Sequence, residues 1–337
     1  GGSTLNAVEN RLWLEKCNPA ALDGGLIQRT LWQRFRLSPA AREAGCNVLF
    51  VPGGSYAGNF HPVVTMSRNM LPFEFGELKR YGWSLFTVKL LLLRLTQARS
   101  YRKADGLIFL TDYARKVVPS VTGILHGKIS TIPHGLNSRF LLAPKTQRAM
   151  TDYSNNNPYR VLYVSIIDKY KHQWHVVEAI SILRQQGYPV ILDLVGPAYP
   201  PALKRLNAAI ERLDGAERWV NYYGAIPFDE LHVRYAQADL GLFASSCENM
   251  PNILIETMAS GLPIACSNRG PMPEVLGVAG IYFDPENSTD IARSIRKLID
   301  SPRLRSELAQ ESYRRAHQYS WRQCADETFK FLAKVAG

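Results

Sequence analysis

The sequence predicts an α/β protein with two doubly wound domains that face each other across a cleft. Short apolar runs alternate with helical patterns along most of the chain. Most of these runs are continuously apolar, as in strands that a parallel sheet buries on both faces. The chain has 337 residues, which is too long for one small core, so two domains are expected.

The first domain is expected over residues 1–143. No β-rich run precedes the glycines at the start, although a doubly wound domain normally opens with a strand. Two explanations stay open: the chain lacks an upstream strand-helix-strand unit, or its first residues are a disordered cloned leader. The strands of this domain are predicted at 47–51, 63–66, 106–111 and 128–133.

The polar stretch 144–158, with SNNNP in its middle, is the expected linker. The second domain is expected over 159–318, followed by a C-terminal helix over 319–337 that crosses back to the first domain. Its strands are predicted at 160–166, 190–196, 219–224, 239–245, 262–267 and 280–283. Helical patterns separate them at 175–187, 199–215 and 229–239.

Positive charge is concentrated in the first part of the chain. Residues 1–150 contain 20 Lys and Arg against 8 Asp and Glu, whereas residues 151–337 contain 20 against 21. The first part is therefore expected to meet an anionic partner, such as a lipid surface or a phosphorylated acceptor. No recognition motif accompanies the charge, which argues against specific nucleic-acid binding.

Part of this charge lies in the segment 79–103, which holds seven Lys and Arg and no acid. Aromatic residues and leucines are interleaved with the basic residues. Two interpretations stay open. The segment forms a basic amphipathic surface on anionic lipid headgroups, or it is an ordinary helix that buries its leucines and keeps its basic face in water.

The cysteines and the apolar runs bear on location. The five cysteines have no CxxC or CxxxH spacing and are interpreted as free thiols of a reducing compartment. The apolar run 90–93 is far too short to span a bilayer. We therefore expect a cytoplasmic protein, either free or peripheral at the inner face of the membrane.

The run SSCENMPNILIETMASG, residues 245–261, predicts a helix directly after a buried strand. Pro251 suits the first helical position, where its missing N–H costs nothing. Asn249 is the expected N-cap, and Gly261 is the expected end of the helix. Free N–H groups and the positive end of the helix dipole make the first turn a predicted phosphate site.

Two glutamates flank this predicted phosphate site. Glu248 lies just ahead of the helix, and Glu256 lies inside it. Beside a phosphate such carboxylates become useful when they accept hydrogen bonds from sugar hydroxyls on either side of a diphosphate. The alternative is that both glutamates are ordinary solvated side chains.

Three segments together resemble one family. CENMPNILIETMASGLPIACS resembles the Glu-x7-Glu signature of the retaining GT-B glycosyltransferases of family four. VSIIDKYKHQWHVVEAI, at 164–180, resembles the strand-loop-helix that opens their second domain, and SNRGPMPEVLGVAGIYFDP, at 267–285, resembles their Gly-x-Pro-Glu segment. The resemblance is strong over 155–320 and moderate over 47–143. It implies two Rossmann-like domains, the first on the acceptor side and the second binding a nucleotide-sugar donor.

The resemblance also implies residue roles. Glu256 would hold the ribose hydroxyls, Glu248 would contact the donor sugar, and Lys171 would neutralise the diphosphate as it leaves. Glu248 and Lys171 are therefore the predicted catalytic residues. No metal or other cofactor is implied; the donor would be a UDP or GDP sugar. Further donor contacts are implied for Asn249, Met250, Asn252, Ile253, Gly224, Ile226 and Gly270.

The sequence departs from the family pattern at two places. Ser165 stands where the family usually has an arginine, and Lys169 is the expected substitute in donor binding. The family's His-Asp in the first domain is replaced by residues that include Arg68 and Asn69, which are expected to face the donor sugar or the acceptor.

The function expected from the resemblance is transfer of a sugar, with retention, from a nucleotide-diphosphate donor to a hydroxyl acceptor in cell-surface glycan assembly. A lipid-linked glycan is the expected acceptor. Two alternatives stay open. One is a non-catalytic nucleotide-sugar-binding protein or inactive fragment, and the other is a nucleotide-sugar epimerase or a phosphorylase.

Overall fold

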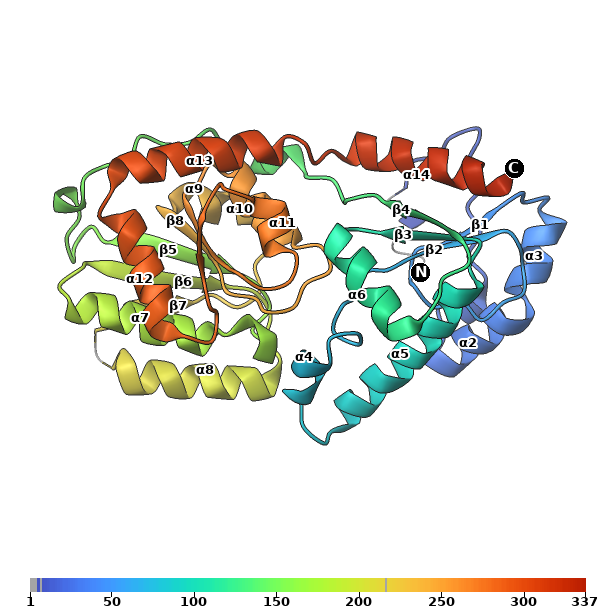
Figure 1. The fold of residues 1–337 in the computed structure, drawn as a ribbon, viewed down its shortest axis with the longest axis horizontal. Coiled ribbons are helices and arrows are strands. Elements are labelled where there is room, and N and C mark those ends of the chain that lie inside the picture. Colours follow the sequence, from blue (N-terminus) through green and yellow to red (C-terminus); the bar gives the residue numbers. More distant parts are fainter. Residues whose placement is uncertain (1–4, 7, 216) are drawn as a thin grey trace.

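The computed structural model describes residues 5–6, 8–215 and 217–337. The chain forms two lobes, each built on a parallel β-sheet (Figure 1). We call the lobe with the four-stranded sheet the first lobe and the lobe with the six-stranded sheet the second lobe. Among the described residues, no helix combines the length and the apolar character that crossing a bilayer requires.

The strands of the first lobe pair in chain order, and all four predicted strands are confirmed. Every residue of the second and third strands is buried, as their continuous apolar runs predict. The first strand lies at one side of the sheet, and a unit upstream of it stays a prediction. The strands are β1 (Leu49–Val51), β2 (Val63–Met66), β3 (Gly106–Phe109) and β4 (Lys128–Thr131).

Helices connect these strands and precede them. The described helices before the second lobe are η1 (Ala20–Leu22), α2 (Leu26–Phe35), α3 (Leu37–Glu43), α4 (Phe75–Lys79), α5 (Leu85–Lys103), α6 (Asp112–Thr122), η2 (Ser138–Phe140) and η3 (Met150–Asp152).

The C-terminal helix α14 (Trp321–Ala336) returns from the second lobe and packs on the first sheet (Figure 1). A Cβ atom added to Gly106 of β3 would lie 2.9 Å from Val335 and 3.1 Å from Phe331, so glycine lets this helix approach the strand closely. The predicted crossing of the C-terminal helix is confirmed.

The second sheet has the strand order β10-β9-β8-β5-β6-β7, and all six predicted strands are confirmed. The direction of strand addition reverses between β5 and β8, which makes their carboxyl ends the expected place for a ligand. The strands are β5 (Tyr159–Val164), β6 (Val190–Val195), β7 (Val220–Tyr222), β8 (Leu240–Phe243), β9 (Ile264–Ser267) and β10 (Ile281–Phe283).

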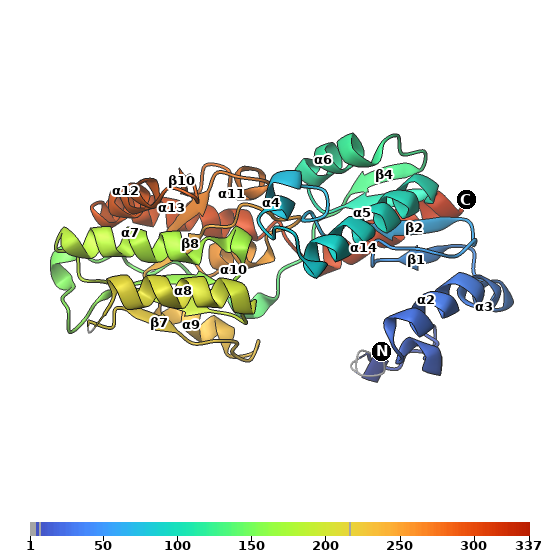
Figure 2. The ribbon, with the colours of Figure 1, turned by 90° about the horizontal axis from the view of Figure 1, so that it is seen from below.

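Helices cover the second sheet in two groups. In one group α7 packs against α8 and α12, and in the other α10 packs against α11 and α13 (Figure 2). The helices are η4 (Lys169–Lys171), α7 (Gln173–Gln185), α8 (Pro200–Leu213), α9 (Leu231–Gln237), α10 (Asn252–Ala259), α11 (Met272–Leu276), α12 (Ser288–Ile299) and α13 (Pro302–Ala316).

Residues 144–158 run along the second lobe without regular strands. The Lys145 amine donates to the carbonyl oxygen of Ala238 at 2.9 Å, just after helix α9. A cation at this point satisfies carbonyl groups that a helix end leaves without partners. The domain boundaries on either side of this segment stay a prediction.

Candidate active site

The loops that follow β5 and β8 meet where the strand order reverses. Lys171, in the first of these loops, forms an ion pair with Glu248, in the second. Lys171 is only 5% exposed, and its amine lies 5.2 Å from the ring centroid of Phe243. The structure therefore brings together the two residues predicted to be catalytic, in surroundings that strengthen their attraction.

Local backbone geometry positions Lys171. Asp168 begins the turn of η4 by accepting from the N–H of Lys169 at 2.6 Å. His172 then adopts a left-handed conformation, with φ 54° and ψ 29°, which turns the chain into α7. Its Nε2 lies 2.9 Å from Ser246 Oγ and so links the two loops. Burial, assisted by the positive charge of Arg80, lowers the pKa of His172 to about 3, so this histidine is neutral.

Helix α10 begins one residue later than the sequence predicts. Pro251 is the N-cap residue and not the first helical residue. The prediction that Asn249 caps the helix is wrong, because its side-chain oxygen accepts no hydrogen bond from the described residues. Its side-chain amide donates to Ser67 Oγ of the first lobe at 3.3 Å. The Asn249 side chain, which local propensity assigns to the helix cap, is therefore used in a contact between the lobes. Gly261 ends the helix with φ +62°, as predicted.

The amides at the start of α10 are only partly free. The N–H of Asn252 donates to the carbonyl of Met250 at 2.9 Å, and the predicted phosphate contact from the Asn252 amide stays a prediction. Within the described parts of the chain, the N–H groups of Ile253 and Leu254 have no acceptor. Any anion at this helix start would therefore be held by these two amides.

Glu256 carries a buried oxygen that has no hydrogen-bond donor among the described residues. Burial raises the pKa of its carboxyl from the ordinary 4.5 to about 7. A buried acceptor without a donor costs free energy unless a ligand supplies the donor. A ligand that brings hydrogen-bond donors would satisfy this oxygen.

Ser165 and Lys169 do not join the glutamates. Ser165 is buried, and its Oγ accepts from the side-chain amide of Gln173 at 2.8 Å. The Lys169 amine donates to the carbonyl of Arg80 in the first lobe, at 2.8 Å. Lys169 thus makes its contact away from the Lys171–Glu248 pair, and its predicted role in donor binding stays a prediction.

Three apolar or glycine positions were predicted to contact the donor. Gly270 has φ +54°, and a Cβ atom on it would lie 3.9 Å from the Glu248 amide, so it lies beside the glutamate loop. Gly224 has φ +68°, and its carbonyl accepts from the N–H of Gly196 at 2.8 Å, next to the end of β6. Ile226 is partly buried against the core of the second lobe.

The first lobe places His134 beside the start of α10. His134 Nδ1 lies 3.4 Å from the side-chain amide of Asn252. Burial, followed by the positive charge of Arg68, lowers the pKa of His134. Asn69 has a local role, because its side-chain oxygen accepts from the N–H of Leu71 at 3.1 Å. The sequence marks His134 only by its position after a strand of the first domain, which fits a turn as well as a place at the cleft.

Further polar contacts hold the lobes together. The Glu274 carboxylate accepts from the N–H groups of Asp112 and Tyr113, both at 2.8 Å, and so caps helix α6 of the other lobe. Arg80 of the first lobe pairs with Glu286 of the second at 2.6 Å. The sequence does not identify the partners in these contacts, because only the tertiary arrangement brings them together.

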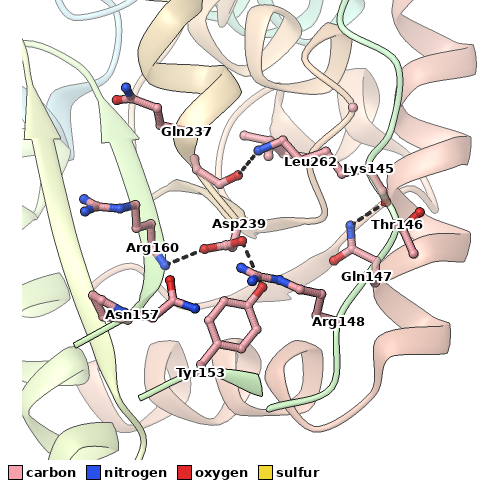
Figure 3. Close-up of a pocket in the computed structure, with 13 residues that line it drawn as sticks. Lys145, Thr146, Gln147, Arg148, Tyr153, Asn157, Arg160, Gln237, Asp239 and Leu262 are labelled. Carbon is pink, nitrogen blue, oxygen red and sulfur yellow. Dashed lines mark hydrogen bonds between the residues drawn. The ribbon is translucent and has the colours of Figure 1, made fainter. Parts of the chain in front are cut away.

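A separate polar cavity of about 300 Å³ lies at the amino ends of β5 and β8. Figure 3 shows that Asp239, which lines this cavity, accepts from Tyr153 and from the backbone N–H of Arg160, both at 2.9 Å. This cavity lies at the sheet edge opposite to Lys171 and Glu248. It is therefore not part of the same site.

The sequence and the fold both match known proteins. Residues 148–315 match the model of the family described as Glycosyl transferases group 1, and the chain is a member of this family. The predicted family resemblance is thereby confirmed. Among the described residues, no cluster of three or more His, Cys, Asp or Glu side chains could hold a metal ion.

Curated relatives include the O-antigen chain mannosyltransferase B of Escherichia coli, 28% identical over 170 residues, which cover 50% of this chain and 44% of that protein. The MMP alpha-(1->4)-mannosyltransferase of Mycolicibacterium hassiacum is 25% identical over 252 residues, covering 71% of this chain and 57% of that one. The chain thus spans less than half the length of the first relative.

Solved structures confirm the predicted GT-B fold. Sucrose-phosphate synthase from Thermosynechococcus elongatus matches with a TM-score of 0.69 and 18% identity, over 92% of this chain and 78% of that one. Anabaena HepE in complex with UDP and glucose matches with a TM-score of 0.66 and 18% identity, over 88% and 80% of the two chains.

Proposed function

We propose that this protein is a retaining glycosyltransferase that moves a sugar from a nucleotide-diphosphate donor to a hydroxyl acceptor in glycan assembly. One observation carries the proposal. The Lys171–Glu248 pair lies at the switch point of the second sheet, next to a helix start with free amides and a buried carboxylate that lacks a donor.

In this proposal each group binds a different part of the donor. The amides of Ile253 and Leu254, with Lys171, hold the diphosphate, and Glu256 accepts from the ribose hydroxyls. The arriving phosphate replaces Glu248 as the partner of Lys171, which frees Glu248 to accept from hydroxyls of the donor sugar. The names of the curated relatives favour mannose as this sugar.

The remaining predicted donor residues border these groups. Asn249, Met250, Asn252 and Gly270 surround the sugar and the diphosphate, while Gly224 and Ile226 lie beside the base. Lys171 then stabilises the negative charge that develops on the leaving diphosphate, which is the largest contribution we expect to catalysis.

The test is a thermal-shift panel of UDP-, GDP- and ADP-sugars on the wild-type protein and on Glu256→Ala. We expect one nucleotide class to stabilise the wild type and to stabilise the variant much less. Equal shifts in both proteins, or no shift with any nucleotide sugar, would contradict the proposed donor site.

A second candidate is a nucleotide-sugar-binding protein without turnover. The observation that favours it is Ser165, which is buried and hydrogen-bonded to Gln173, so that no second cation stands beside Lys171 at this position. Incubation with the stabilising nucleotide sugar separates the candidates. Release of free nucleoside diphosphate supports the transferase, whereas binding without any release supports the second candidate.

We also propose that the protein works at the cytoplasmic face of an anionic membrane, where a lipid-linked glycan would be its acceptor. Helix α5 and the loop before it expose Trp83 (106%), Leu85 (90%), Leu92 (58%) and Leu95 (65%). The segment 79–103 has seven basic residues and no acid to repel a lipid phosphate. These leucines are not buried in the lobe, which favours the lipid interpretation.

Vesicle co-sedimentation tests the membrane proposal. Wild-type protein should sediment with vesicles of anionic phosphatidylglycerol and much less with vesicles of phosphatidylcholine. Leu85→Ser combined with Leu92→Ser should reduce sedimentation, whereas Val278→Ser, an exposed apolar residue of the second lobe, should not. Equal sedimentation of both variants would contradict the assignment of this surface.

A further inference from the structure

A second cavity lies where the two lobes meet, on the side of α7 and α8. Its volume is about 430 Å³. Figure 1 shows α4 of the first lobe next to the end of α8 at this junction. Three of the lining side chains are basic and none is acidic: the cavity is lined by Arg80, Lys169, Trp174, Pro201, Ala202 and Arg205.

The positive charge in this cavity is only partly compensated. Arg80 pairs with Glu77 at 2.7 Å and with Glu286 at 2.6 Å. Lys169 and Arg205 form no ion pair with any residue that the structure describes. The guanidinium of Arg205 instead lies 4.0 Å from the ring centroid of Trp174, which holds the cation in place without neutralising it.

Trp174 supports Arg205 at the wall of this cavity. The residue is 3% exposed, and its Nε1–H is buried with no acceptor among the described residues. Because this N–H has no surface open to the cavity, the polar groups that can meet a ligand there are the three basic side chains. The ligand that fits this cavity therefore brings negative charge.

The cavity is distinct from the proposed donor site, although η4 contributes to both. Lys171 pairs with Glu248, whereas Lys169, two residues earlier, reaches the carbonyl of Arg80 and lines this cavity. The lining residues include neither glutamate of the donor site. The turn η4 therefore places Lys169 at this cavity and Lys171 at the proposed donor site.

We propose that this cavity binds a phosphate or diphosphate group of the acceptor. The anion would lie between Lys169 and Arg205 and would accept hydrogen bonds from both side chains. The assignment of this anion to the acceptor rests on the proposed glycosyltransferase function, whereas the anion site itself does not. The loop after Arg80 continues directly to the exposed Trp83 and Leu85, so a lipid-bound diphosphate could reach the cavity from the proposed membrane face.

Calorimetry with inorganic pyrophosphate tests the site. UDP or GDP is kept at saturating concentration, so that the donor site is filled and cannot take the pyrophosphate. The wild type should bind pyrophosphate, and Arg205→Ala should weaken this binding about tenfold or more, because charge-assisted hydrogen bonds are lost. Lys169→Ala should weaken it as well.

Lys204→Ala is the matched control. It removes one positive charge from the same helix, but Lys204 lines a different hollow and not this cavity. Its pyrophosphate affinity should equal that of the wild type. Absence of pyrophosphate binding to the wild type, or the same affinity in Arg205→Ala and Lys204→Ala, would overturn the inference.

A short-chain isoprenyl diphosphate distinguishes the sources of the anion. Tighter binding than that of pyrophosphate, lost in Trp83→Ser, supports a lipid diphosphate; equal affinity of both supports a free or sugar-borne phosphate in the same site. If pyrophosphate binds through Arg205 while no nucleotide sugar shifts the melting temperature, the anion site stands and the glycosyltransferase proposal fails.

Discussion

Replacement of Glu256 by glutamine should stabilise the free protein while it weakens donor binding. The pKa of this buried carboxyl rises from 4.5 to about 7 in the folded state. Between these pH values the unfolded chain loses the proton and the folded chain keeps it, so stability falls as pH rises. Each pH unit corresponds to ~1.36 kcal/mol, which gives an upper value of about 3 kcal/mol.

The size of the difference depends on pH. Below pH 4.5 both states of the wild type are protonated, and the variant should gain little. Above pH 7 both states are ionised, and the full cost of the buried charge is present in the wild type only. After allowance for local relaxation, we expect Glu256→Gln to be more stable by about 1–3 kcal/mol at pH 8.

The assay is urea unfolding of wild type and Glu256→Gln at pH 5 and at pH 8, without nucleotide. Glu211→Gln is the matched control, because it makes the same change at an exposed position of α8. The reasoning is refuted if Glu256→Gln is equally or less stable than the wild type at pH 8, or if its gain does not shrink at pH 5.

Three further predictions follow from the same geometry. Nucleotide-sugar binding at pH 6 should release close to one proton in the wild type and none in Glu256→Gln, measured by calorimetry in two buffers; equal release would contradict ribose binding by this carboxylate. Gly261→Ala should lower the free energy of unfolding by about 1–3 kcal/mol, because φ is +62° and the new Cβ would lie 2.6 Å from the Leu142 carbonyl oxygen. Gly187→Ala, where the new Cβ would meet open space, should cost less in the same unfolding experiment. Glu274→Ala should let the lobes separate and raise the radius of gyration in small-angle scattering; an unchanged radius would show that this cap does not hold the lobes together.

The periodic parts of the chain could be predicted from sequence. All ten strands were expected within a few residues, because each is a short apolar run between helical patterns. The resemblance also paired Lys171 with Glu248 at one site, and the strand order explains why their loops meet. These features depend on local patterns and on a fold whose strand order is regular.

The features that could not be predicted depend on contacts between the lobes. Asn249 stands where local propensity predicts an N-cap, yet its side-chain amide donates a hydrogen bond to Ser67. Lys169 is predicted from the sequence to bind the donor, yet its amine donates a hydrogen bond to the carbonyl oxygen of Arg80. In both cases the partner lies far away in the chain, and no local propensity identifies it.

The most direct test of the proposed donor site is hydrogen–deuterium exchange with and without the stabilising nucleotide sugar. The amides of Ile253 and Leu254 lack acceptors in the described structure, so a bound diphosphate should slow their exchange strongly. We predict protection in peptides covering 165–172 and 248–257 of the wild type, lost in Glu256→Ala. Protection confined to 145–160, at the opposite edge of the sheet, would contradict the account.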